Sequence, residues 1–266
     1  MIKRYRGWAL VAGASEGLGA SFAERLASRG YDVLLVARRV DRLEALAGLL
    51  VARHGVEAVP IGIDLAAPDV QEQLRAAVAG REVGVLVCNA AFAPLGGFLE
   101  TPVEEAVRAL DVNCRSTLML LHALLPAMVA RRSGGVVIMS SLTAFQGSPW
   151  ASVYGSTKAF GLALAEGVAH EVAESGVDVI ACCAGATRTP NYLARAAEGG
   201  APGELAPEQV VEETLDRLGA ANIVIPGRFN RLASWLMRLL PRSLAVRIMG
   251  QQTRKLQTGR TAAPPV

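Results

Sequence analysis

Short apolar, β-branched runs alternate with helix-length segments along most of this chain. The runs read as strands within residues 8–13, 32–37, 56–63, 83–89, 134–140, 177–183 and 222–226. The helical patterns between them cover residues 17–29, 41–53, 68–80, 103–131, 152–175 and 207–218. Apolar strands that alternate with helices form a parallel sheet covered on both faces. The sequence therefore predicts an α/β fold, a doubly wound Rossmann fold with seven parallel strands, whose ligands bind at the carboxyl ends of the strands.

Length and composition indicate one domain. The 266 residues are 52% hydrophobic and 19% charged, as in a compact globular protein, and no linker or internal repeat divides them. We expect a core over residues 6–227, a basic helical extension over 228–250 and a disordered tail over 251–266. The formal net charge of +3 is too small to indicate nucleic-acid binding.

A glycine-rich loop, GASEGLG, follows the first predicted strand directly and precedes a helix. Glycine permits a tight turn and lets backbone N–H groups approach a pyrophosphate at the positive end of a helix. Because the loop joins a strand to a helix in the first βα unit, it predicts dinucleotide binding. The candidate contacts in this loop are Gly13, Ser15, Glu16, Gly17, Leu18 and Gly19.

The end of the second predicted strand indicates which dinucleotide binds. An acidic residue there would bond the ribose 2′-hydroxyl of NAD, whereas arginine accommodates the phosphate of NADP. Arg38 and Arg39 occupy this window, and the nearby Asp41 is expected to cap a helix in a capping box with Glu44. We therefore predict NADP(H) in preference to NAD(H), with Arg38 the better candidate; the alternative is a pair of solvated arginines.

A tyrosine and a lysine stand one helical turn apart in the segment SVYGSTKAF. Tyr154 and Lys158 are i and i+4, which places both side chains on one face of a helix. A free phenol has a pKa of about 10, so it exchanges protons poorly near neutrality unless a nearby cation stabilises the phenolate. We expect Lys158, helped by a positive nicotinamide, to supply that cation. The alternative is a buried tyrosine beside a lysine whose ammonium reaches solvent.

These motifs, in this order, resemble the short-chain dehydrogenase/reductase family over residues 6–227. GASEGLG resembles its cofactor loop, and CNAA at residues 88–91 resembles its NNAG signature. Asn113, and Ser141 thirteen residues before Tyr154, fall at the family's remaining catalytic positions. The tail is similar to that of a subgroup containing DltE-like proteins and 17β-hydroxysteroid dehydrogenase 12 relatives.

The resemblance implies an oxidoreductase with the catalytic tetrad Asn113, Ser141, Tyr154 and Lys158. Ser141 would hydrogen-bond the substrate oxygen, and Tyr154 would give or take its proton. Lys158 would also bind the nicotinamide ribose, and Asn113 would hold a water that relays protons to solvent. The neighbouring Ser140 is one residue out of register, so we expect it to cap or pack.

The same resemblance implies further cofactor contacts outside the glycine loop. They are Asp64, Leu65, Asn89, Ala90, Gly185, Thr187 and Thr189. One of the two threonines is expected to reach the cofactor, and their alternative role is to cap the helix that begins at PNYL. Ala12, the CNAA segment and Ala184 depart from the family pattern, and these changes touch the support of the cofactor loop, not the tetrad.

Residues 228–250 form a basic amphipathic pattern. Apolar residues recur at helical spacing within 229–240, Arg228, Arg231 and Arg238 lie largely off that face, and no acidic residue occurs in the segment. Such a helix lies on a membrane surface, packs its apolar face over the active-site cleft, or remains a solvated extension. With few polar residues in the expected substrate loop, the substrate is predicted to be a hydrophobic carbonyl or alcohol, such as a steroid or a 3-oxoacyl compound.

The leading hypothesis is thus an NADP(H)-dependent carbonyl reductase or alcohol dehydrogenase. The alternatives are a non-catalytic dinucleotide sensor or scaffold, and a membrane-surface protein that acts through its tail. The resemblance implies a homodimer or homotetramer formed through residues 103–131 and 152–175. The four cysteines have apolar neighbours and no CxxC pair, and the apolar core WALVA is too short for a signal peptide. We expect no metal and a cytoplasmic protein, with membrane association through the tail left open.

Overall fold

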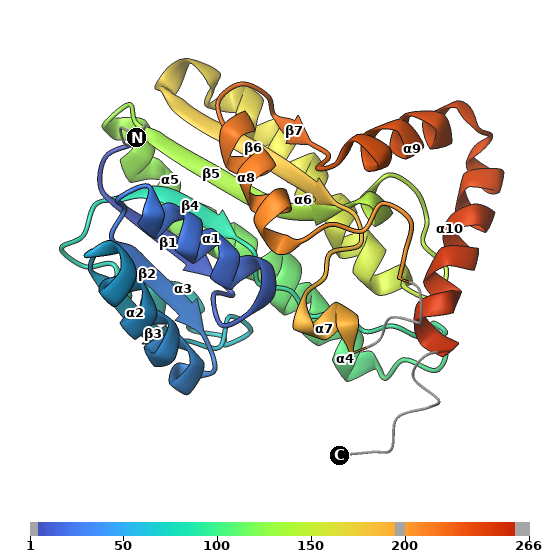
Figure 1. The fold of residues 1–266 in the computed structure, drawn as a ribbon, viewed down its shortest axis with the longest axis horizontal. Coiled ribbons are helices and arrows are strands. Elements are labelled where there is room, and N and C mark those ends of the chain that lie inside the picture. The colour runs from blue at the N-terminus through green and yellow to red at the C-terminus, as the bar shows by residue number, and fades with distance from the viewer. Residues whose placement is uncertain (1–4, 195–199, 259–266) are drawn as a thin grey trace.

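The computed structural model describes residues 5–194 and 200–258. Its centre is a parallel seven-stranded sheet in the order β3-β2-β1-β4-β5-β6-β7 (Figure 1). The strands are β1 (Trp8–Ala12), β2 (Val33–Ala37), β3 (Ala58–Gly62), β4 (Val83–Cys88), β5 (Gly134–Ser141), β6 (Val177–Ala184) and β7 (Ile223–Val224). The strand order reverses between β1 and β4, which is the point where α/β sheets bind their ligands.

Helices cover both faces of the sheet (Figure 1). One buried core joins the sheet to α1 (Gly17–Ser28), α2 (Val40–His54) and α8 (Pro207–Arg217). A second core, on the opposite face, joins it to α3 (Val70–Ala77), α5 (Ser116–Ala130) and α6 (Ser152–Glu171). Every residue of β2, β4 and β5 is buried, as expected of strands covered on both faces. The predicted doubly wound fold is confirmed.

The remaining elements lie mostly toward the carboxyl ends of the strands. They are α4 (Val103–Leu110), the π-helical turn η1 (Asp111–Arg115), the 3₁₀ turns η2 (Leu142–Ala144) and η3 (Ala173–Ser175), α7 (Pro190–Leu193), α9 (Arg228–Leu239) and α10 (Arg242–Thr258). The helices α9 and α10 extend past the carboxyl end of the sheet, and α10 runs across the direction of the strands there (Figure 1).

Two local expectations are wrong. Helix α2 begins at Val40 with Arg39 as its N-cap, so Asp41 lies inside the first turn and forms no capping box with Glu44. The reason is that only two residues separate the end of β2 from the helix, which starts before Asp41 is reached. Helix α10 continues to Thr258, so residues 251–258 are helical where the sequence predicts disorder. Residues 259–266 lie outside the described part of the chain.

The run from Val103 to Ala130 is a continuous helical stretch of 28 residues that comprises α4, η1 and α5. In the described residues it is the one helical run long and apolar enough to cross a membrane, and 44% of its most apolar window is buried inside the fold. Its side chains Leu120, Leu121 and Met128 belong to the core beneath the sheet. The α5 part of this run is therefore a core helix of the α/β fold.

Candidate active site

The four predicted catalytic residues come together at the carboxyl end of β5. Ser141 is the last residue of this strand, and α6, which packs along β5, carries Tyr154 and Lys158. Asn113 lies in the π-helical turn between α4 and α5 and bonds to α6. Strand β5, helix α6 and the π-helical turn η1 therefore bring residues that are far apart in the sequence together in one site.

Lys158 is buried, and its position is fixed by the strand. Its Nζ donates a hydrogen bond to the main-chain oxygen of Met139 at 2.9 Å and lies 5.6 Å from the centroid of the Tyr154 ring. Burial lowers the pKa of Lys158 from 10.5 to about 8. The ammonium is thus charged at neutral pH but loses its proton more readily than a solvated lysine does.

Burial also acts on Tyr154, in the opposite sense. It raises the pKa of the phenol above 10.0, and the nearby Ser141 hydroxyl only partly opposes this effect. The Lys158 ammonium over the ring does not reverse this effect by itself, so the pKa of Tyr154 stays above that of a free phenol. The phenol is therefore protonated at neutral pH, which is the form that donates a proton to a carbonyl oxygen.

Asn113 uses its side chain to join two segments of the site. Its Oδ1 accepts from the Phe92 N–H at 2.7 Å, and its Nδ2 donates to the Phe92 oxygen at 2.9 Å and to Thr157 Oγ1 at 2.8 Å. Thr157 in turn donates to the main-chain oxygen of Tyr154 at 2.8 Å. These bonds fix the loop after β4 against the turn of α6 that carries Tyr154.

Sequence reasoning missed two of these anchors, Thr157 and the carbonyl of Met139. Neither belongs to a recognised motif, and the contacts span 44 and 19 residues of sequence. Ser140 is placed as expected for a packing residue, because its hydroxyl donates to the Lys158 main-chain oxygen at 2.8 Å. Two hydrogen bonds with Met139 and Ser140 of β5 thus hold Lys158 of α6 against this strand, one to its ammonium and one to its main-chain oxygen.

The glycine loop packs against the end of β4 with no room for side chains. A Cβ at Gly13, whose φ is +81°, would lie 2.6 Å from Ala90 Cα, and one at Gly19 would overlap the Gly13 carbonyl oxygen. Asn89 Nδ2 donates to that same oxygen at 3.0 Å. Asn89 and Ala90 therefore support the loop from the neighbouring strand, across the sheet's switch point.

The amino end of α1 is suited to an anion. Its first turn contains no acidic residue, and the N-cap residue Glu16 provides no side-chain cap, so the first N–H groups of the helix are not capped by a side chain. The Glu16 carboxylate instead pairs with Arg39 at 2.9 Å and Arg42 at 2.6 Å, and Arg39 also donates to Ser15 Oγ at 3.0 Å. A narrow glycine turn and a helix start without a side-chain cap fit a pyrophosphate.

The two arginines after β2 differ in their contacts. Arg39 is occupied by the glycine loop, whereas Arg38 is exposed and forms no ion pair with any described residue. The charge of Arg38 acts on Asp64, which also pairs with Arg108 at 3.0 Å. Burial raises the pKa of Asp64, but the Ala66 N–H and the two arginines outweigh it, and the pKa lies below 3.8.

The side chains of Leu18 and Leu65 face the interior. Leu65 is buried in the core, and Leu18 packs against the core on the opposite face of the sheet. A contact between Leu65 and a ligand at this edge would therefore use its backbone.

The loop after β6 packs against the glycine loop. Thr189 accepts from the Tyr192 N–H at 3.2 Å and so caps α7, and a Cβ at Gly17 would lie 3.0 Å from its methyl carbon. Thr187 is buried, and its hydroxyl donates to the Gly185 oxygen at 3.1 Å. The predicted capping role is thus confirmed for Thr189, the threonine that lies against the glycine loop.

Gly185 is close to a residue of the C-terminal extension. A Cβ on Gly185 would lie 2.8 Å from Asn230 Nδ2, and this buried amide donates to the oxygens of Gly203 and Pro226, each at 3.0 Å. Asn230 therefore attaches α9 to the loop beside the site. The sequence pattern gave no signal for it, because an isolated asparagine on the polar side of a helix is expected to be solvated.

The C-terminal helices contact the turn that leads into α6. Thr253 Oγ1 donates to the Pro149 oxygen, the Arg254 guanidinium lies 5.5 Å from the Trp150 ring centroid, and Arg238 lies 4.5 Å from that of Phe145. The backbone of Trp150 is in the left-handed region, with φ +65°, which is unusual for a bulky residue. Helix α10 thus holds a strained turn four residues before Tyr154.

The apolar face of α9 does not pack over the site. Phe229, Leu232, Trp235, Leu236 and Leu239 are all exposed, and the buried residues of this helix are Asn230 and Ser234. Of the three placements that the sequence leaves open for this helix, packing of its apolar face over the active-site cleft is the one that this exposure excludes. The reason is that polar Asn230 and Ser234 fill the side of α9 that faces the fold, so the apolar side turns outward.

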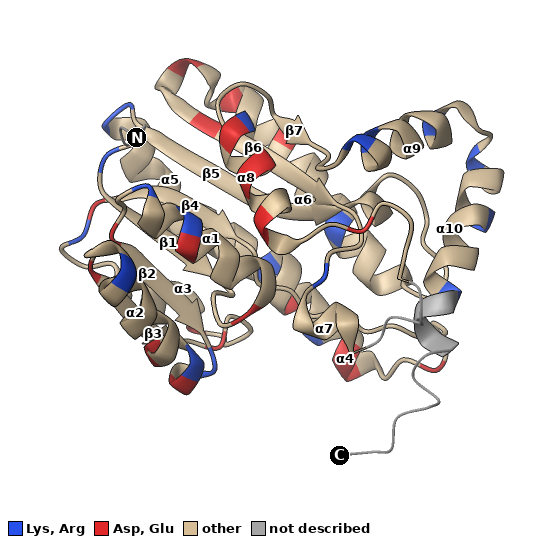
Figure 2. Cartoon of the chain, in the orientation of Figure 1, with Lys and Arg blue, Asp and Glu red and all other residues tan. Residues whose placement is uncertain are grey.

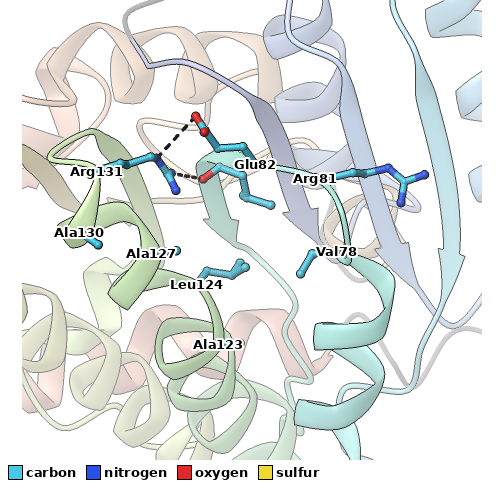
Figure 3. Close-up of a pocket in the computed structure, with 9 residues that line it drawn as sticks. Val78, Arg81, Glu82, Ala123, Leu124, Ala127, Ala130 and Arg131 are labelled. Carbon is cyan, nitrogen blue, oxygen red and sulfur yellow. Dashed lines mark hydrogen bonds and ion pairs between the residues drawn. The ribbon is translucent and has the colours of Figure 1, made fainter.

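A hollow of about 510 Å³ lies elsewhere, at the amino end of β4 (Figure 3). It is bounded by the apolar side chains of Val78 and Leu124 and by Arg131, which donates to the Val83 oxygen and pairs with Glu82 at 3.7 Å. Val83 starts β4, whereas Asn89 and Ala90 follow its end. This hollow therefore lies at the amino ends of the strands, and the tetrad lies at their carboxyl ends.

The four cysteines are buried free thiols, as predicted. Burial raises the pKa of Cys88 and Cys182 to about 12, so neither is a reactive thiolate at neutral pH. Within residues 5–194 and 200–258, no three His, Cys, Asp or Glu side chains gather as a metal site. The chemistry of the site rests on hydroxyl, ammonium and amide groups.

Comparison with known proteins agrees with this geometry. Residues 7–198 match the family model described as short chain dehydrogenase. The 7β-hydroxysteroid dehydrogenase of Collinsella aerofaciens is 35% identical over 86% of this chain and 89% of its own. A solved structure of a 7β-hydroxysteroid dehydrogenase has a TM-score of 0.87 at 32% identity, covering 92% of this chain and 97% of that chain. A short-chain dehydrogenase from Sphingobium yanoikuyae in complex with NADPH has a TM-score of 0.78 at 30% identity, covering 90% and 98%.

Proposed function

The chain belongs to the short-chain dehydrogenase family, and on that premise we propose that it is an NADP(H)-dependent oxidoreductase that interconverts a lipophilic ketone and its alcohol. The observation that carries the proposal is the Tyr154–Lys158 pair, with Nζ 5.6 Å from the ring centroid and Ser141 beside the phenol. A dinucleotide sensor would need the glycine loop but no half-buried phenol next to a buried ammonium. The site therefore favours an enzyme over the non-catalytic alternative.

The chain's residues fit a nicotinamide dinucleotide at the end of β1. The glycine loop and the start of α1 would hold the pyrophosphate, and Arg38, exposed and free of ion pairs in the described structure, would hold the 2′-phosphate of NADP(H). Lys158 would bond the nicotinamide ribose, and Thr189 would lie next to the pyrophosphate through its contact with Gly17. When bound, the cofactor supplies or accepts the hydride.

The proton of the reaction is handled by the tetrad. In the reductive direction, Ser141 donates a hydrogen bond to the substrate oxygen and Tyr154 gives it a proton as negative charge develops there. The raised pKa of Tyr154 keeps this proton in place at neutral pH. Together with the positive nicotinamide of the oxidised cofactor, the Lys158 ammonium would stabilise the phenolate that remains, which Lys158 alone does not achieve. Asn113 holds the loop after β4 and α6 in register around the pair. In the oxidative direction the same groups act in reverse.

Steroids are the substrate class we propose. The support is twofold: two of the three relatives named above are 7β-hydroxysteroid dehydrogenases, and the sequence has few polar residues in the expected substrate loop. Membership of the DltE-like and 17β-hydroxysteroid dehydrogenase 12-like subgroup remains a prediction. The cytoplasmic location also remains a prediction, as does a homodimer or homotetramer formed through residues 103–131 and 152–175.

The experiment is a substrate and cofactor panel. NADPH consumption would be followed at 340 nm with oxo-steroids, 3-oxoacyl thioesters, and aromatic and aliphatic ketones, each repeated with NADH. We expect turnover of oxo-steroids with NADPH and a kcat/KM at least tenfold lower with NADH. Activity with NADH alone would contradict the role of Arg38, and turnover of polar ketones alone would contradict the substrate class.

A further inference from the structure

Helix α9 presents an exposed apolar face that the fold leaves uncovered. Trp235 is 58% exposed, Leu236 48% and Leu239 65%, and Phe229 and Leu232 lie on the same face. Soluble proteins rarely gather several large apolar side chains on one exposed surface without a partner for it. We call this set of side chains the α9 face.

The two helices at this end of the chain, α9 and α10, carry one sign of charge. Helices α9 and α10 hold arginines and no acidic residue over positions 228–254 (Figure 2). Arg228, Arg242 and Arg247 are exposed and form no ion pair with the described residues. Arg231 pairs with Glu213 at 2.7 Å, and Arg238 and Arg254 lie over aromatic rings. Arg228 begins α9 and Arg242 begins α10, three residues after Leu239, so a cation free for a partner stands at each end of the α9 face.

The α9 face is held in place by its polar side. Asn230 is 3% exposed and bonds to Gly203 and Pro226, and Ser234 is also buried. Helix α10 is attached through Thr253 to the Pro149 oxygen. Because the polar residues of α9 face inward, the outward apolar surface is part of the folded state and not an effect of fraying.

We propose that the α9 face, with Arg228, Arg242 and Arg247, docks the protein on an anionic lipid bilayer. An outward tryptophan and leucines beside arginines have the composition of a helix that lies in the interface of a membrane. Each cation near such a surface adds to the attraction, and none is offset by a carboxylate within the two helices. A second copy of the chain is a poorer partner, since a symmetric contact would bring the same arginines together.

The test uses the full chain and vesicles, and activity plays no part in it. Flotation would be measured with neutral phosphatidylcholine vesicles and with vesicles that contain about one third phosphatidylglycerol. We expect binding to the anionic vesicles alone, weakened by salt as the cations are screened. Leu236→Ser should weaken it about tenfold or more, and Arg242→Gln about fivefold.

Matched changes elsewhere serve as controls. Leu49 on α2 is 49% exposed, close to the 48% of Leu236, so Leu49→Ser tests a similar loss of exposed apolar area away from the α9 face. Arg75→Gln on α3 does the same for charge. Neither should change binding. Equal loss from Leu49→Ser and Leu236→Ser, or equal binding to neutral and anionic vesicles, would overturn the proposal. A different result would identify the α9 face as a contact between copies of the chain. In that case the unmodified chain binds no vesicles, and Leu236→Ser has a lower molecular mass by light scattering than the unmodified chain.

Discussion

The buried charge of the Lys158 ammonium should lower the free energy of unfolding of this protein. Replacing it by an apolar side chain of similar length, Lys158→Met, should therefore raise the free energy of unfolding at neutral pH. Burial lowers its pKa from 10.5 to about 8. A lowered pKa means that the unfolded chain binds the proton more tightly than the folded one, at a cost of about 1.4 kcal/mol per pKa unit, or ~3 kcal/mol here. Loss of the hydrogen bond to the Met139 oxygen offsets about 1 kcal/mol of this. The net expected gain is ~2 kcal/mol at pH 7.

The pH dependence of this gain is its signature. Below pH 8, Lys158 is protonated in both the folded and the unfolded chain, and the full free-energy cost of burying its charge applies. Between pH 8 and 10.5, Lys158 loses its proton in the folded chain but keeps it in the unfolded chain, so this cost shrinks as the pH rises. Urea unfolding of both proteins at pH 7 and pH 9.5 should show a gain that falls from ~2 kcal/mol to about zero. Tyr154→Phe is the control, because its phenol stays protonated over most of this range. A variant that is less stable than the unmodified protein at pH 7, or a difference that is constant with pH, would refute the reasoning.

Three further predictions concern the cofactor loop, the phosphate arginine and the C-terminal helix. Gly19→Ala should abolish NADPH binding in a fluorescence titration, because its Cβ overlaps the Gly13 oxygen, whereas Gly48→Ala, with nothing within 4 Å, should bind normally and gain up to about 1 kcal/mol of stability. Arg38→Gln should weaken NADPH binding about tenfold and leave NADH binding nearly unchanged; equal weakening of both would argue against a 2′-phosphate contact. Thr253→Val should raise the KM for the ketone several-fold with the Kd for NADPH unchanged, since it releases the turn before Tyr154, and Gln252→Ala, an exposed neighbour, should alter neither.

The parts of the site that sequence predicted are those that local spacing determines. Tyr154 and Lys158 share a helix face because they are i and i+4, and the glycine loop follows a strand and opens a helix. The apolar runs that alternate with helical patterns likewise predicted all seven strands, with bounds within a few residues of those in the structure. Each of these depends on interactions between near neighbours along the chain.

The parts that sequence missed depend on distant contacts. Asn230 meets Gly203 and Gly185, which are 27 and 45 residues away in the sequence, only through the tertiary fold, and the Met139 carbonyl meets Lys158 through packing of α6 on β5. The outward turn of α9 was equally inaccessible, because helical periodicity shows that a helix has an apolar face but not which way that face points. Its orientation is decided by the hydrogen bonds of Asn230 and the burial of Ser234.

The most direct measurement of the central claim is the comparison of Tyr154→Phe with the unmodified protein in turnover and in cofactor binding. If Tyr154 is the proton donor, its loss should lower kcat for ketone reduction by at least about a hundredfold. The Kd for NADPH from fluorescence titration should change less than about threefold, because the phenylalanine keeps the ring beneath the Lys158 ammonium. Residual turnover within tenfold of the unmodified protein, at full NADPH occupancy, would contradict the account.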